Sequence, residues 1–127
     1  MDTLIIAVPS ETPGGLDAAV GMHFGHCDLY TIVEAKNGEI VDVRTLPNVP
    51  HQQGGCMAPV NHLARNGVKV LIAGGMGLRP LMGFQQAGVR VVHGGGLPSV
   101  GHAVQAFLTD SLPTFSTENT CGGGAQH

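Results

Sequence analysis

Residues 69–80, KVLIAGGMGLRP, constrain the fold more strongly than any other stretch of this 127-residue chain. The short apolar run at residues 70–73 leads into a glycine turn, and a helical pattern begins at Leu78. Apolar runs before a Gly-rich turn are typical of interior strands in parallel sheets. A similar unit recurs 21 residues later, where GVKV at residues 67–70 returns as GVRV at residues 88–91. The two units predict adjacent parallel strands, at residues 70–73 and 89–92, each followed by a helix.

The rest of the chain predicts three more strands and one more helix, at residues 4–8, 29–34, 40–44 and 58–66. Asn37-Gly38 is a strong hairpin signal, so the strands on either side of it should be antiparallel. In the helix at residues 78–87 we expect one face to hold Leu78, Leu81, Met82 and Gln85. Ser99 is a good N-cap for the last helix. Its apolar stripe consists of Val100, Ala103, Val104, Phe107 and Leu108.

Four segments converge on one edge of the sheet if the second strand runs antiparallel to the first. They are the loops at residues 10–27 and 45–57 and the glycine turns at residues 74–77 and 93–96. Ligands of open α/β sheets bind at the carboxyl ends of the strands. These segments carry imidazoles, thiols and thioethers at His23, His26, Cys27, His51, Cys56, Met57, Met76 and His93. Such groups are ligands for copper, zinc and iron–sulfur units.

Each of these residues also has a purely structural interpretation. Cys27 and Cys56 can be small buried side chains, and His62 and His102 suit surface or capping positions on helices. The glycine turns can serve only as tight connections. No CxxC pair is present, so a zinc finger is not indicated. The helix N-termini after Gly77 and Pro98 offer N–H groups to an anion, and Arg79 adds charge at the first of them.

The composition excludes several classes of function. A net charge of −3 gives no basic field for binding nucleic acid. No apolar run approaches the roughly 18 residues of a membrane span. Three cysteines cannot all pair internally, which favours a reduced, cytoplasmic setting. The acidic residues are scattered, so acid–base catalysis is not indicated.

Two segments resemble a known family. GMHFGHCD at residues 21–28 resembles its "HFG" element, and residues 67–88 resemble its central glycine-rich element. This is the dinitrogenase iron–molybdenum cofactor biosynthesis family, which includes NifX-like proteins and the C-terminal domain of NifB. The resemblance extends over about residues 4–108. It implies a ribonuclease-H-like three-layer α/β fold, with a mixed five-stranded sheet, an antiparallel second strand and helices on both faces. At His26-Cys27 the chain departs from the family pattern, where many members have Arg-Ala.

The resemblance implies a non-catalytic carrier or scaffold for a metal–sulfur cluster, iron–sulfur or molybdenum-containing, in cofactor assembly or delivery. On this basis we expect the cluster-binding residues to be His23, Gly25, His26, Gly74, Gly75, Met76, Gly77, Arg79, His93, Gly94 and Gly95. The expected metal ligands are His23, Cys27, Cys56, Cys121 and His127. Many family members also end in a similar Cys/Gly/His-rich tail, so we expect one domain at residues 1–110 and a flexible tail at residues 111–127.

Two other functions stay open. The chain could be a small regulatory or adaptor protein that partners an assembly ATPase, with incidental cysteines. It could also be a ribonuclease-H-like phosphoester hydrolase, which needs clustered carboxylates around divalent metal. For the carrier, the expected partners are the cluster and cluster-assembly proteins or an ATPase, with neither nucleic acid nor membrane involved.

Overall fold

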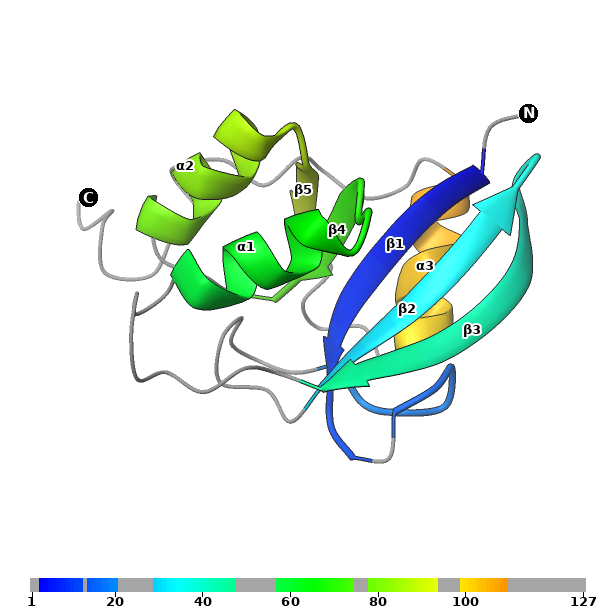
Figure 1. Cartoon of the computed structure of the whole chain (residues 1–127). Coiled ribbons are helices and arrows are strands. Elements are labelled where there is room, and N and C mark those ends of the chain that lie inside the picture. The colour runs from blue at the N-terminus through cyan, green and yellow to red at the C-terminus, as the bar shows by residue number, and fades with distance from the viewer. Residues whose placement is uncertain are drawn as a thin grey trace.

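A mixed five-stranded sheet lies at the centre of the fold, with the strand order β3-β2-β1-β4-β5 (Figure 1). The structure is a computed structural model that describes residues 3–12, 14–20, 29–47, 57–74, 78–93 and 99–109, with only the backbone for residues 57–59 and 78–80. Within these residues the strands are β1 (Thr3–Ser10), β2 (Leu29–Lys36), β3 (Glu39–Pro47), β4 (Val70–Ala73) and β5 (Arg90–His93). The helices are α1 (Met57–Arg65), α2 (Leu78–Ala87) and α3 (Val100–Leu108).

Strand β2 runs antiparallel to both of its neighbours, as predicted. It pairs with β1 from Thr3↔Lys36 to Ser10↔Leu29, while β1, β4 and β5 are parallel to one another. The turn between β2 and β3 consists of Asn37 and Gly38, with φ of 54° and 80°. Positive φ at both positions suits the right-handed twist of a hairpin, which explains the Asn-Gly pair.

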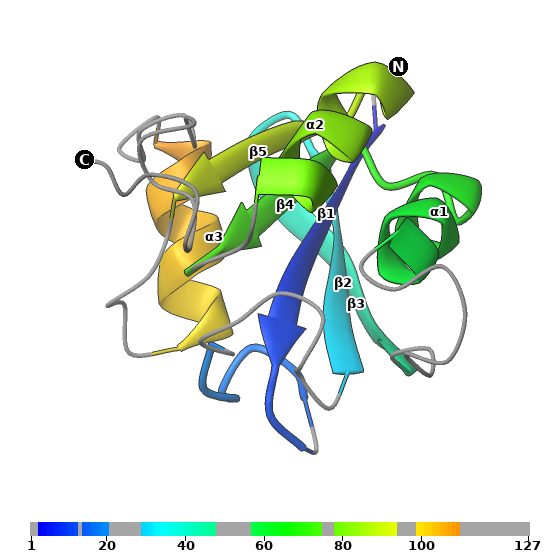
Figure 2. The ribbon, with the colours of Figure 1, turned by 90° about the vertical axis from the view of Figure 1, so that its left-hand side faces the viewer.

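The helices cover both faces of the sheet, with α1 and α3 on opposite sides (Figure 2). Side chains alternate between the faces along each strand. Leu71 therefore joins α1 and α2 in one apolar cluster, whose largest members include Tyr30, Leu63, Leu81 and Phe84. Its neighbour Ile72 joins α3 in the other, with Ile6, Val8, Val100 and Val104. Full burial of one such aliphatic or aromatic side chain stabilises the fold by roughly 1.5–3 kcal/mol.

The internal repeat of the sequence is also a repeat of backbone geometry. A glycine with positive φ follows each of α1 and α2, with 81° at Gly67 and 82° at Gly88. Matching C-terminal hydrogen bonds follow, from N–H to carbonyl oxygen: Gly67 to Ala64 (3.2 Å), Val68 to Leu63 (3.2 Å), Gly88 to Gln85 (3.2 Å) and Val89 to Phe84 (2.9 Å). These bonds satisfy carbonyls that the helix leaves unpaired. Each glycine thus turns the chain from a helix into the next parallel strand.

The strands around the hairpin are longer than predicted, and β5 begins and ends one residue later. The prediction ended the first strand before Pro9, yet β1 continues to Ser10. Pro9 pairs with Tyr30 of β2, whereas β4 pairs only with Ile6 and Ala7. Proline is tolerated there because β4 makes no ladder pair at that position that would need its missing N–H.

The buried face of α2 also differs from the prediction. Leu81 is fully buried, as expected, but Met82 is 47% exposed and Gln85 is exposed, while Phe84 is fully buried instead. Leu81 and Phe84 lie three residues apart and belong to the same cluster as Val60 and Leu63 of α1. The stripe of α3 is confirmed, with Phe107 and Leu108 half-buried at its end. None of the helices among the described residues is long and apolar enough to cross a membrane.

Candidate functional site

One edge of the sheet collects the carboxyl ends of β1, β3, β4 and β5 and the start of β2; we call it the loop edge. Ser10, Leu29 and Pro47 lie opposite one another across β1, β2 and β3. Ala73 lies opposite His93 across β4 and β5. Ala7 of β1 pairs with Leu71 of β4, so two residues further along Pro9 is level with Ala73. The predicted convergence at this edge is therefore confirmed for the strand ends.

The parallel half of the loop edge is narrow enough for a single small ligand. Neighbouring strands lie about 4.8 Å apart, so β1 and β5 are separated by roughly 10 Å. The chain leaves β4 at Gly74 and β5 at His93, both half-buried. The described ends of β4 and β5 thus lie on neighbouring strands, as a site shared by both glycine turns requires.

Most of the predicted site residues lie outside the described residues. Gly74 and His93 are described in full, and for Arg79 the backbone is described, in the first turn of α2. All the other predicted site residues lie outside the described residues: His23, Gly25, His26, Cys27, Cys56, Gly75, Met76, Gly77, Gly94, Gly95, Cys121 and His127. Their roles stay predictions. Within the described part of the chain, no three His, Cys, Asp or Glu side chains form a group that could hold a metal ion.

The first turn of α3 is not the anion site that the sequence suggested. The N–H groups of Val100 and Gly101 donate to the carbonyl oxygens of Ala18 and Leu16, at 2.9 and 2.8 Å. The next N–H, of His102, donates to the Ser99 hydroxyl oxygen at 3.3 Å. Each of these three N–H groups already donates one hydrogen bond, so they are not available to bind an anion. The expectation of a binding site after Pro98 that uses these N–H groups is therefore wrong.

The segment that caps α3 is a loop, as predicted: the described residues between 11 and 20 form no helix or strand. It is nevertheless attached to the sheet, because Ser10 forms an isolated antiparallel bridge with Val20 and the Glu11 N–H donates to the Ala19 carbonyl oxygen at 3.2 Å. Leu16, Ala18 and Val20 pack against the cluster beneath α3. Their spacing of two is an alternation that could have revealed this segment in the sequence. Residues 14–20 thus pack against the cluster beneath α3 and contact the end of β1 at the loop edge.

A buried chain of hydrogen bonds attaches this segment to the sheet. Ser10 and Thr31 are fully buried polar side chains, and their hydroxyl oxygens lie 2.8 Å apart. The Ser10 hydroxyl donates to the Val8 carbonyl oxygen at 2.7 Å, so the proton between the two hydroxyls comes from Thr31. The Gly15 N–H donates to the Thr31 hydroxyl oxygen at 3.1 Å. These hydrogen bonds fix the position of the segment that follows β1.

A concave region lies beside α3, with a volume of about 360 Å³. It is lined by Leu16, Asp17, Ile40, Ser99, Gly101, His102 and Gln105. Nδ1 of His102 lies 2.7 Å from the Ser99 hydroxyl oxygen, an exposed contact at the start of the helix. The contact lies beside the N-cap hydrogen bond that the His102 N–H donates to the same hydroxyl. None of the described residues that line this region is a predicted site residue.

Comparison with known proteins identifies the family. The chain is 28% identical over 95 residues to the uncharacterized protein MJ0580 of Methanocaldococcus jannaschii, covering 73% of this chain and 80% of that protein. Its fold matches the apo form of the orange protein from Desulfovibrio gigas, with TM-score 0.77, 28% identity and coverage of 88% and 92%. A Thermotoga protein named as a candidate NifB protein matches with TM-score 0.72, 26% identity and coverage of 89% and 97%. The dinitrogenase iron–molybdenum cofactor family model matches residues 3–110, so the chain belongs to this family.

Proposed function

We propose that this protein is a non-catalytic carrier or scaffold that binds a preassembled metal–sulfur cluster at the loop edge. The observation that carries the proposal is the meeting of five strand ends at one edge. The segments that carry the predicted glycines, imidazoles and thiols are joined to these strand ends. A site built in this way draws its groups from parts of the chain that are far apart in sequence.

Covalent connectivity supports a common location for these groups. Cys56 directly precedes Met57, the first residue of α1, and Cys27 lies two residues before Leu29. Because consecutive Cα atoms are about 3.8 Å apart, we propose that both thiols act close to the ends of these elements. Gly75 and Gly94 directly follow Gly74 and His93 in the same way. The tail at residues 111–127 does not directly adjoin a strand end in the sequence, and we assign it a secondary role as a delivery ligand.

The chemistry of these residues favours an anionic cluster over a bare hard cation. Glycine turns offer backbone N–H donors that suit the sulfides of a cluster. Thiolate and imidazole are ligands for iron, copper and zinc, whereas Ca²⁺ and Mg²⁺ require oxygen ligands. The family name and the existence of an apo form of the Desulfovibrio gigas relative agree with a protein that takes up such a group.

The carboxylates on the strands give little support to the hydrolase alternative. Strands β1, β4 and β5 contain none. On β2, Glu34 pairs with Ile5, toward the end of the sheet opposite the loop edge. Its carboxylate and that of Asp42 lie 3.9 and 3.3 Å from Arg44. These groups form surface ion pairs rather than a centre for two metal ions.

We also propose that the fold is ribonuclease-H-like and that the protein acts in the cytoplasm. The strand order and the antiparallel β2 support the name ribonuclease-H-like. We assign residues 1–110 to one domain and residues 111–127 to a tail that assists loading. Cluster-assembly proteins or an ATPase would act as donor or recipient in the cytoplasm.

Anaerobic purification of the full chain from its native host tests the proposal. We expect charge-transfer bands in the visible spectrum and stoichiometric iron, molybdenum or copper. His23→Ala, Cys27→Ser and Cys56→Ser should each lower the bound metal, and His102→Ala on α3 is a matched control that should retain it. A colourless, metal-free protein that stays so after anaerobic reconstitution would contradict the proposal.

A further inference from the structure

Strand β3 is an edge strand with an accessible outer side. Among the described strands it pairs with β2 alone (Figure 1). Most of its residues are exposed, including Val41, which is 55% exposed and one of two large apolar side chains exposed in the described part of the chain. An edge strand presents backbone N–H and C=O groups that can pair with another strand.

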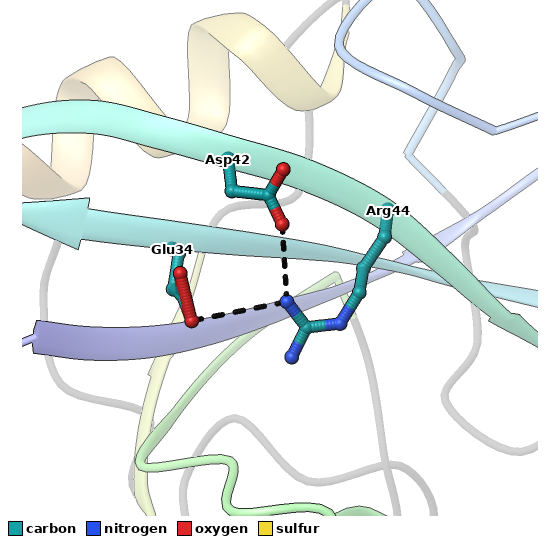
Figure 3. A network of polar contacts seen from close by, with 3 residues as sticks. All are labelled: Glu34, Asp42 and Arg44. Carbon is teal, nitrogen blue, oxygen red and sulfur yellow. Dashed lines mark hydrogen bonds and ion pairs between the residues drawn. The ribbon is translucent and has the colours of Figure 1, made fainter.

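The charges on β3 are arranged symmetrically about Val43. Asp42 precedes it and Arg44 follows it, so both side chains lie on the same face of the sheet. Arg44 contacts Asp42 at 3.3 Å and Glu34 of β2 at 3.9 Å (Figure 3). The Asp42 and Arg44 side chains are 54% and 48% exposed, so both remain accessible to a second molecule.

We propose that β3 binds a second copy of this chain by antiparallel pairing of residues 41–45 about a two-fold axis at Val43. Asp42 then lies opposite Arg44 of the partner subunit, and Arg44 lies opposite the partner's Asp42. Val41 lies opposite Thr45 of the partner subunit, and the two Val43 residues face each other. Opposite charges and β-branched residues are favourable cross-strand neighbours.

The charges also select this register over its neighbours. A two-fold axis at residue 42 would place two aspartates opposite each other, and an axis at residue 44 would do the same with two arginines. Like charges directly opposite are destabilising. A slip by one residue would leave Asp42 opposite Val43 or Thr45 of the partner subunit, and in neither case would the charge pairs form. The pattern thus fits one self-pairing arrangement and disfavours the alternatives.

The same residues could instead protect the edge from pairing. Charges and bulges often have this role, and the register shift between Glu34 and Ala35 leaves Val41 as an extra residue on β3. The bulge limits the regular ladder to a short stretch. The dimer should therefore be weak and depend on concentration. Protection predicts that no combination of charges on β3 promotes association, whereas our proposal requires that complementary combinations do so.

Charge exchange between two copies separates these interpretations and does not depend on the cargo. Asp42→Arg gives a chain with two arginines about Val43, and Arg44→Asp gives one with two aspartates. Each variant alone should associate at least about tenfold more weakly than the wild type. Mixed at equal concentration, the two variants should form a heterodimer with both cross-strand pairs restored. Glu39→Arg, with the same change in charge on the same strand, should leave association unchanged.

Sedimentation equilibrium and native mass spectrometry of the full chain provide the measurement, with circular dichroism to check folding. A wild-type chain that stays monomeric up to millimolar concentration would overturn the proposal. So would mixed variants that form no heterodimer while both remain folded. If one variant does not fold, the double exchange Asp42→Arg/Arg44→Asp keeps the test available. It should dimerise like the wild type, and failure to do so would also count against the proposal.

Discussion

Gly14 and Gly38 have the same backbone φ of 80° but opposite surroundings. A Cβ at Gly14 would lie 2.7 Å from Leu29 Cδ1 and 2.7 Å from Thr45 Cγ2, whereas one at Gly38 would meet nothing within 4 Å. Left-handed backbone disfavours an L side chain by about 1–2 kcal/mol at both positions. Only at Gly14 is overpacking added, at about 1–3 kcal/mol. We therefore expect Gly14→Ala to lower the free energy of unfolding more than Gly38→Ala, by about 1–3 kcal/mol.

Urea unfolding of the two variants gives this difference directly, because the conformational penalty is common to both. A similar loss of stability in Gly14→Ala and Gly38→Ala would mean that residues 14–20 adjust easily to an added methyl group. In that case the segment would not provide rigid support for the loop edge.

Thr31→Val should lower the free energy of unfolding by about 1–3 kcal/mol, because it leaves the Gly15 N–H without its acceptor and removes the donor to Ser10. The volume of the side chain is nearly unchanged. Thr45 lies opposite Thr31 on β3 and is exposed, so Thr45→Val is the matched control, with an expected change within about 0.5 kcal/mol. Equal effects of the two valines in denaturant unfolding would remove any energetic role of the buried hydroxyl chain.

Cys56 should be the more reactive thiol in the cargo-free protein. It directly precedes α1, whose N-terminal end favours a thiolate, whereas Cys27 adjoins Asp28, whose carboxylate opposes ionisation. Iodoacetamide labelling against pH, read by peptide mass spectrometry, should modify Cys56 at lower pH than Cys27. Bound cargo should protect both. Equal labelling that is insensitive to cargo would make the thiols bystanders and leave His23 with the glycine turns as the site.

Deletion of residues 117–127 should leave folding intact and weaken cargo retention. Fifteen or so extended residues span roughly 50 Å, and a helix with the nine residues of α3 is about 14 Å long, so the tail can reach the loop edge. Thermal unfolding of the truncated chain should match that of the full chain, while its cluster should be lost faster to a chelator. Unchanged retention would separate Cys121 and His127 from the site.

Hard cations should not bind specifically. Calorimetric titration of the cargo-free chain with Ca²⁺ or Mg²⁺ should give no saturable heat, because the site is expected to offer N–H, imidazole and thiol groups instead of oxygen ligands. Tight binding of either ion would favour the hydrolase alternative, which uses divalent metal.

The local features of the fold could be predicted wherever neighbouring residues alone decide them. The bounds of β4 and α2 and the Ser99 cap of α3 agree with the sequence, since glycines and a capping side chain define them. The buried face of α2 could not be predicted, because Met82 is as apolar as Leu81 and only the packing of α1 selects between them. The antiparallel pairing of β2 with β3 was predicted from Asn37-Gly38, whereas that of β2 with β1 was predicted from the family resemblance.

For the site, the sequence predicted the edge but not its support. Loop signals at residues 10–27 concealed a segment whose carbonyl groups cap α3. The hydrogen bonds themselves could not be predicted, because every residue type offers a carbonyl group; the alternation of Leu16, Ala18 and Val20 is the signal that the sequence contains. The ligand set itself depends on residues 21–28, 48–56, 75–77 and 94–98, which remain predictions.

The parallel pairing of β1 with β4 is short, with register pairs at Ile6↔Val70 and Ala7↔Leu71. This pairing joins two halves of the sheet. One half consists of β1, β2 and β3 and leads into the segments with Cys27 and Cys56. The other consists of β4 and β5 and leads into the glycine turns. A ligand bound to residues of both halves would bridge the β1–β4 pairing and stabilise it. Ile6, Ala7 and Leu71 are fully buried members of the two apolar clusters, so β1 and β4 cannot separate without disrupting the core. The two halves should therefore keep a fixed spacing while a ligand binds and leaves, and hydrogen exchange at Ile6 and Ala7 should be slow both with the ligand and without it.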